Sequence, residues 1–154
     1  MNRILVASVL ALGALGTGAQ AQDVREIRFA PGASSGTVSG AVVRGTRDVY
    51  AFTARKGQTA ELRLVSLESN AAFSIWRPGA QLGADAGSDI VGKSLPGAGE
   101  GQDAMHWRGR LPDSGRYFVI VGPTRGNATY ELRLSIGARP ALPRPAAAAS
   151  LPPK

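Results

Sequence analysis

Hydrophobic and polar residues alternate strictly in two stretches of this chain. In the first stretch, Ala60, Leu62 and Leu64 alternate with Glu61 and Arg63. In the second, the apolar positions are Tyr130, Leu132, Leu134 and Ile136, and the polar positions between them are Glu131, Arg133 and Ser135. A period of two is typical of a β-strand that has one face in a core and the other in solvent. Both stretches therefore predict half-buried strands.

Further strands are predicted where β-branched and aromatic runs lie between turn residues. In the segment LPDSGRYFVI, residues 111–120, a Pro-Asp-Ser-Gly turn leads directly into such a run. We expect strands near residues 27–29, 37–43, 49–53, 59–67, 73–76, 105–111, 116–121 and 129–136. The sequence thus predicts an all-β protein, an antiparallel β-sandwich of about eight strands. The side chains expected to point inward are Leu62, Leu64, Val119, Val121, Leu132 and Leu134.

Two features interrupt this regular pattern. Gly40 lies inside the second predicted strand, which indicates either a bulge or a close approach of another group to the backbone. Residues 79–102 are rich in Gly, Ala, Asp and Ser and are too long for a hairpin turn. We expect them to form a surface loop with at most one short element, around Ile90 and Val91.

The chain is predicted to hold one folded domain between two other segments. Residues 1–21 combine the basic Arg3, an apolar stretch from Ile4 to Leu15 and an Ala-Gln-Ala cleavage pattern, as in a signal peptide. The apolar stretch is too short to span a bilayer comfortably, so we expect cleavage near Ala21 and no stable membrane insertion afterwards. The β-sandwich domain then covers residues 22–137. The Pro- and Ala-rich residues 138–154 predict a disordered tail.

The amino-acid composition limits the kinds of functional site that the protein can contain. The chain has no cysteine, which excludes disulfides, thiolate catalysis and cysteine metal sites. Its formal net charge is +7, and Arg3 is the only charge in the predicted signal peptide, so +6 remains after cleavage. Arginine outnumbers lysine, which favours bidentate contacts with carboxylates, although a merely solvated face would have the same composition. The charge would suit nucleic acid, but export argues against that partner.

The sequence does not predict an enzyme. The single histidine, His106, lies beside Trp107 in a strand, and Ser114 is not in a Gly-x-Ser-x-Gly elbow. A zinc site needs more His or Cys residues. Nothing distinguishes a pair of carboxylates for glycoside hydrolysis among Glu61, Glu68, Asp103 and Asp113. We therefore predict no cofactor and no metal, with one alternative left open, a calcium ion shared by Asp85 and Asp89.

Four segments carry a resemblance to a known family. They read IRFAPGASSGTVSG, VYAFTARKGQ, LPDSGRYFVIV and TRGNATYELRLSI, and the resemblance covers about residues 24 to 136. In this order they resemble the periplasmic inhibitors of g-type lysozyme and, more broadly, the pre-peptidase C-terminal (PPC-like) β-sandwich domains. The resemblance implies a periplasmic protein whose partner is a g-type lysozyme. The chain departs from the inhibitors around Gly45 to Tyr50, where they have a tyrosine-rich loop, and in the insertion at 79–102.

The resemblance implies a binding surface made of loops on a rigid sandwich, because an arginine-bearing loop can fill a cleft lined by carboxylates. Arg125 ranks first. The predicted partner-binding residues are Arg125, Ser114, Gly115, Arg116, Tyr117, Thr124 and Asn127. Ser114 and Gly115 also fit a plain strand-entry turn, and Tyr117 also fits the core. If the last two strands form a hairpin, the Ser114 and Arg125 loops lie at its opposite ends, and at most one enters the cleft.

Three functions remain open at this point. The first is a periplasmic lysozyme inhibitor that blocks the active-site cleft. The second is a PPC-like accessory domain of the envelope that binds wall polysaccharide or another envelope protein. The third is a structural protein whose tail attaches to peptidoglycan, which is a further candidate partner. Trp76 and Trp107 discriminate among them, because exposed tryptophans stack on sugars whereas buried ones belong to the core.

Overall fold

The computed structural model describes residues 23–84 and 87–137. Its strands are β1 (Val24–Glu26), β2 (Ser35–Val42), β3 (Asp48–Ala54), β4 (Thr59–Ser66), β5 (Ala71–Trp76), β6 (His106–Arg110), β7 (Gly115–Pro123) and β8 (Ala128–Gly137). The predicted signal peptide, the predicted tail and Asp85 of the calcium alternative lie outside the described residues. Within the described part of the chain there is no helix long and apolar enough to cross a membrane.

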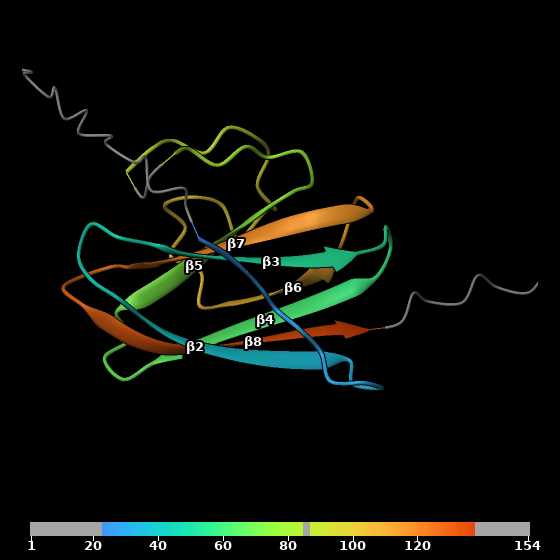
Figure 1. Cartoon of the computed structure of the whole chain (residues 1–154), viewed down its shortest axis with the longest axis horizontal. Helices are drawn as coiled ribbons and strands as arrows, with labels where there is room; N and C mark the ends of the chain where they lie inside the picture. Colours follow the sequence, from blue (N-terminus) through green and yellow to red (C-terminus); the bar gives the residue numbers. More distant parts are fainter. Residues whose placement is uncertain (1–22, 85–86, 138–154) are drawn as a thin grey trace, which may run out of the picture.

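The strands form two stacked four-stranded sheets (Figure 1). The first sheet has the order β1-β3-β7-β5, and the second has the order β2-β8-β4-β6. All pairings are antiparallel except that of β1 with β3, which is parallel. The predicted all-β sandwich is thus confirmed. Its first strand is Val24–Glu26 and not the expected 27–29, and the parallel pairing of this strand with β3 was not predicted from the sequence.

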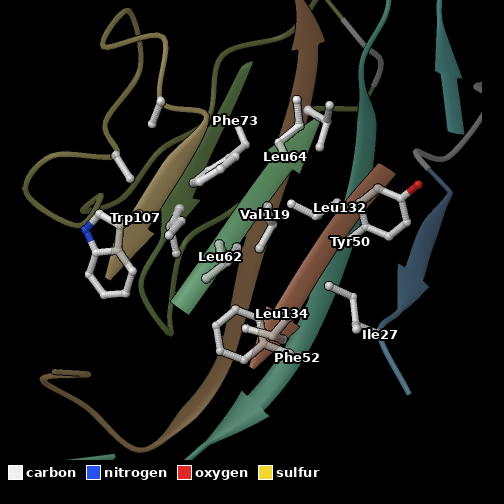
Figure 2. Close-up of a cluster of buried hydrophobic side chains, with 14 of the residues drawn as sticks. Ile27, Tyr50, Phe52, Leu62, Leu64, Phe73, Trp107, Val119, Leu132 and Leu134 are labelled. Carbon is white, nitrogen blue, oxygen red and sulfur yellow. The ribbon is translucent and has the colours of Figure 1, made fainter. Parts of the chain in front are cut away.

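The core lies between the two sheets, as the alternation predicted. Figure 2 shows Leu62, Val119 and Leu132 packed in the same interior cluster. Leu62, Val119, Val121, Leu132 and Leu134 have no exposed surface, and Leu64 is only 3% exposed. Burying each such side chain contributes about 1.5–3 kcal/mol, so this layer is the main source of stability in a chain without disulfides.

Gly40 marks a close approach and not a bulge. The pairing of β2 with β8 runs without interruption from Ser35 to Val42. A Cβ atom at Gly40 would lie 2.4 Å from Tyr130 Oη and 2.7 Å from Asp48 Oδ2. Tyr130 donates a 2.5 Å hydrogen bond to Asp48 Oδ2 and lies 2.7 Å from Tyr50 Oη. Because Tyr130 uses its only proton on the carboxylate, Tyr50 is the donor in the second bond.

The long segment between β5 and β6 covers the first sheet. Figure 1 shows it, in yellow-green, above β5 and β7. Ala80, Leu82 and Ile90 pack against Trp76 and Ile120 on the outer side of that sheet. A single bridge joins Gln81 to Val91, at the place where a short element was expected. The described residues of this segment therefore do more than form the expected surface loop: some cover one sheet, and Leu95 and Ala98 are buried in the main core.

Candidate functional site

The predicted partner-binding residues fall at the two opposite ends of β7. Ser114, Gly115, Arg116 and Tyr117 lie at its start, and Thr124, Arg125 and Asn127 follow its end. At about 3.4 Å per residue, the nine residues of β7 separate the two groups by roughly 27 Å. β7 and β8 do not form a hairpin, since they belong to different sheets. The seven residues therefore do not make a single surface.

The group at the start of β7 is held in an ordered strand-entry turn. Ser114 Oγ accepts a 2.9 Å hydrogen bond from the backbone N–H of Lys56. Gly115 has a φ of +140°, and a Cβ atom there would lie 2.9 Å from Pro78 Cβ. Asp113 accepts hydrogen bonds from Arg77, which hold the pKa of Asp113 below its usual value. Ser114 and Gly115 thus have clear structural roles.

Tyr117 is not a surface residue. Its side chain has no exposed area and stacks on Phe52, with ring centroids 5.3 Å apart. Its hydroxyl donates to the carbonyl of Asp113 and accepts from the N–H of the same residue. Burial raises the pKa of Tyr117. Its inclusion among the partner-binding residues is therefore wrong, and it belongs to the core.

Arg116 forms an ion pair and a cation–π contact within the first sheet. Its guanidinium lies 2.5 Å from Glu26 Oε1 and 5.3 Å from the centre of the Phe118 ring. Both partners lie on the first sheet, in β1 and β7. These contacts join the edge strand to the centre of its sheet.

The other end of the sandwich presents three loops together. They are residues 43–47 between β2 and β3, residues 67–70 between β4 and β5, and residues 124–127 between β7 and β8. Figure 1 shows all of them at the left of the view. Each connects a strand of one sheet to a strand of the other. We call these three loops the loop end.

Hydrogen bonds of Asn70 and Asn127 connect the three loops of the loop end. Asn70 is 5% exposed and donates from Nδ2 to the carbonyl of Asn127 over 2.8 Å. The carbonyl of Asn70 accepts a 2.8 Å bond from the N–H of Thr124. Asn127 Oδ1 in turn accepts the N–H of Arg44 over 3.0 Å. These bonds link all three loops, so Asn127 has a positioning role whether or not it touches a partner.

Arg125 is exposed and makes one internal contact. Its Nη2 donates a 2.7 Å hydrogen bond to the carbonyl oxygen of Glu68 in the neighbouring loop. Arg125 and Arg44 line the same cleft of about 390 Å³, together with Thr124. Within residues 23–84 and 87–137, neither arginine lies within salt-bridge distance of a carboxylate. The loop end therefore presents cationic groups to an incoming ligand.

The loop end also exposes apolar side chains that the sequence analysis missed. Leu67 is 98% exposed and Val43 is 52% exposed, and Val65, near the end of β4, is 67% exposed. The available signal was the alternation in β4: the buried positions are even-numbered, so the odd-numbered Val65 and Leu67 point outward. Arg44 was also missed.

The single histidine of the chain is paired with a carboxylate. His106 is exposed, and its Nε2 lies 3.1 Å from Glu61 Oε1 on the outer face of the second sheet. Glu61 also accepts a bond from Arg63, and these two bonds lower the pKa of Glu61. Among the described residues, no three His, Cys, Asp or Glu side chains are grouped to hold a metal ion.

Both tryptophans are core residues. Trp76 is 6% exposed and donates from Nε1 to Ser74 Oγ over 3.0 Å. Trp107 is 9% exposed and donates to the carbonyl of Pro96 over 2.9 Å. Neither indole offers a free face on which a sugar could stack.

Two four-stranded sheets, with connections that cross between them and loops gathered at each end, define the class of all-β sandwich proteins. No family model and no curated protein matches the sequence. Solved structures do match. The periplasmic inhibitor of g-type lysozyme from Aeromonas hydrophila is 28% identical, with a TM-score of 0.56 over 73% of this chain and 95% of that one.

The corresponding inhibitor from Salmonella Typhimurium is 25% identical, with a TM-score of 0.52 over 73% of this chain and 96% of that one. A mutant of the Escherichia coli inhibitor shares the fold at 24% identity, with a TM-score of 0.52 and the same coverage. These similarities confirm the resemblance to the periplasmic inhibitors of g-type lysozyme that the sequence motifs predicted. The structural neighbours are inhibitors and not enzymes.

Proposed function

We propose that this chain is a periplasmic, non-enzymatic inhibitor of g-type lysozyme and that it blocks the active-site cleft of the lysozyme with its loop end. The observation that carries the proposal is the exposed Arg125 beside Arg44, held on loops that hydrogen bonds tie together. The similarity to structures of inhibitors supports the partner.

The mechanism follows from charge and rigidity. A lysozyme cleft is lined by carboxylates, and a guanidinium can pair with a carboxylate through two parallel hydrogen bonds. The amide bonds of Asn70 and Asn127 order the loops before binding, which lowers the entropy cost of association. Occupation of the cleft would then exclude the polysaccharide without any chemical step.

The predicted signal peptide, cleaved near Ala21, would deliver the protein to the periplasm, where the similar inhibitors are found. A lysozyme that enters the envelope would meet the inhibitor there before it had degraded the wall. No stable attachment to the membrane is needed for this role.

The accessory-domain alternative has one observation in its favour. The outer face of the second sheet carries Arg63, Arg108 and Arg133, with Arg63 directly opposite Arg133 on the neighbouring strand. Like charges in that position cost stability. Glu61 already pairs with Arg63, and a carboxylate-bearing polymer such as peptidoglycan would neutralise the remaining positive charge. The buried state of Trp76 and Trp107 counts against recognition of sugar rings.

The test is a turbidity assay with purified mature protein and g-, c- and i-type lysozymes. Inhibition of the g-type enzyme is expected, and Arg125→Ala should weaken it about thirtyfold, which corresponds to about 2 kcal/mol. Arg125→Lys should recover only part of the loss, because lysine lacks the bidentate geometry. Arg55→Ala, an exposed arginine at the opposite end of the sandwich, is the matched control and should inhibit like the wild type.

Circular dichroism of every variant should confirm the fold. Inhibition by Arg125→Ala within twofold of the wild type would reject the role of Arg125. If the wild type inhibited none of the lysozymes but sedimented with purified peptidoglycan, the accessory-domain alternative would replace the proposal.

A further inference from the structure

Leu67 is the most exposed large apolar residue among the described residues. Its side chain is 98% exposed, although it directly follows β4, whose inward side chains form part of the core. A single exposed leucine on a protein surface is ordinary. Leu67, however, lies at the loop end, where Val43 is 52% exposed, and close to Val65 near the end of β4, which is 67% exposed.

The turn that carries Leu67 is held firmly on both sides. Before it, the buried Ser66 accepts hydrogen bonds at Oγ from the N–H groups of Asn70 and Ala71, over 3.0 and 3.3 Å. The carbonyl of Ser66 accepts the N–H of Ser69 over 3.1 Å. After Leu67, the carbonyl of Glu68 accepts the guanidinium of Arg125. The backbone is therefore fixed in a form that directs this leucine into solvent.

Arg125 also helps to hold the neighbouring loop in place. Its Nη2 bond to Glu68 uses one of its donors and leaves the others available, since a guanidinium has five N–H groups. The residue that presents positive charge also holds the turn next to Leu67. Cationic and apolar groups are in this way presented side by side on one rigid surface.

We propose that Leu67 is the apolar anchor of the loop end and that it enters an apolar subsite of the partner's cleft, next to the carboxylates that pair with Arg125. This inference rests on the proposed function, because it assigns the anchor within the same binding surface. A leucine that passes from water into an apolar subsite contributes about as much as one buried in a core. Leucine is less common than Trp, Tyr or Arg as an anchor, but any anchor residue lies near the centre of an interface, inside a polar rim.

The expected effects are specific. Leu67→Ala should weaken binding to a g-type lysozyme by about 10- to 30-fold, because the removed methyl groups no longer fill the subsite. Leu67→Asp should weaken it further, since a carboxylate would meet the acidic wall of the cleft. Val91→Ala is the matched control: Val91 is 66% exposed and belongs to the segment that covers the first sheet.

The experiment measures dissociation constants for a purified g-type lysozyme by calorimetry, with the wild type, Leu67→Ala, Leu67→Asp, Val91→Ala, Arg125→Ala and the Leu67–Arg125 double alanine variant. The double variant should be less impaired than the sum of the single changes, since loss of Arg125 also frees the turn that positions Leu67. Circular dichroism checks the fold of each protein.

Tight binding by the wild type and Val91→Ala, together with weakened binding by Leu67→Ala, supports the inference. Binding by Leu67→Ala within twofold of the wild type would overturn the inference and leave the proposed function intact. If the wild type did not bind the lysozyme, the proposed function and the inference would fail together.

Discussion

Asn70 Nδ2 donates a 2.8 Å hydrogen bond to the carbonyl oxygen of Asn127, across the gap between two loops that belong to different strand connections. Asn70 is 5% exposed, and the bond is partly buried. It ties the turn that carries Leu67 to the loop that carries Arg125. The relationship makes Asn70 the internal support of the loop end.

Replacing Asn70 with alanine should destabilise the protein by about 1–3 kcal/mol, because the carbonyl of Asn127 would lose its partner. It should also weaken lysozyme inhibition by loosening the arrangement of the loops. Urea unfolding monitored by tryptophan fluorescence measures the first effect, and the turbidity assay measures the second. Glu68→Gln, an exposed neighbour whose backbone contact is retained, should change the free energy of unfolding by less than about 0.5 kcal/mol.

Gly40→Ala should destabilise the sandwich by about 1–3 kcal/mol, because the new methyl group would lie 2.4 Å from Tyr130 Oη and would displace it from Asp48. Gly122→Ala supplies the control. That glycine also lies in a strand, and nothing lies within 4 Å of its added Cβ atom. Thermal unfolding of both variants tests this contrast, and equal midpoints would contradict it.

The pair of Arg77 and Asp113 predicts a pH dependence of stability. The pKa of Asp113 is lowered, first by its hydrogen bond from Arg77, so the folded protein binds this proton less readily than the unfolded chain does. The resulting stabilisation is present above the unfolded pKa of about 3.9 and is lost as the pH falls through the lower folded value.

Asp113→Asn should therefore lower the urea midpoint at pH 5, and the difference from the wild type should shrink between pH 4 and pH 2. Arg77→Gln should give the same profile, because it removes the other half of the pair. The effect should be modest, since both side chains are partly exposed. A difference that is constant across this pH range would rule out the assignment to Asp113.

Because both indoles are buried and hydrogen-bonded, tryptophan emission should be blue-shifted relative to the free amino acid and insensitive to chitooligosaccharides. Fluorescence titration with these sugars measures this directly. Saturable quenching by the sugars would contradict the placement of Trp76 and Trp107 and favour the accessory-domain alternative.

The strands and inward side chains could be predicted from the sequence because alternation is a local signal. Leu62 and Leu132 were assigned correctly from their neighbours alone. Sheet membership is not local: β7 and β8 follow one another in the chain but lie in different sheets. Short strands such as β1, which has three residues, carry too few positions for alternation to be recognised.

The candidate site was harder to predict because its contacts, like sheet membership, join residues that are far apart in the sequence. Arg125 could be ranked from its turn and from the resemblance, but its contact with Glu68 joins residues 57 positions apart. Tyr117 was misassigned as a contact residue because a strand-entry turn looks alike whether its aromatic side chain points in or out. The alternation in β4 indicated that Leu67 points outward, but the turn that presents it at the loop end could be located only from the backbone.

All three connections at the loop end run from one sheet to the other. The positions of Arg44 and Arg125 therefore depend on both layers. A core substitution far from the surface, such as Leu62→Ala, would loosen the packing of the layers and should weaken the proposed inhibition while the protein remains folded. During gradual denaturation, inhibition of lysozyme should therefore be lost before secondary structure is lost. A lysozyme assay would then detect changes in native packing that circular dichroism does not.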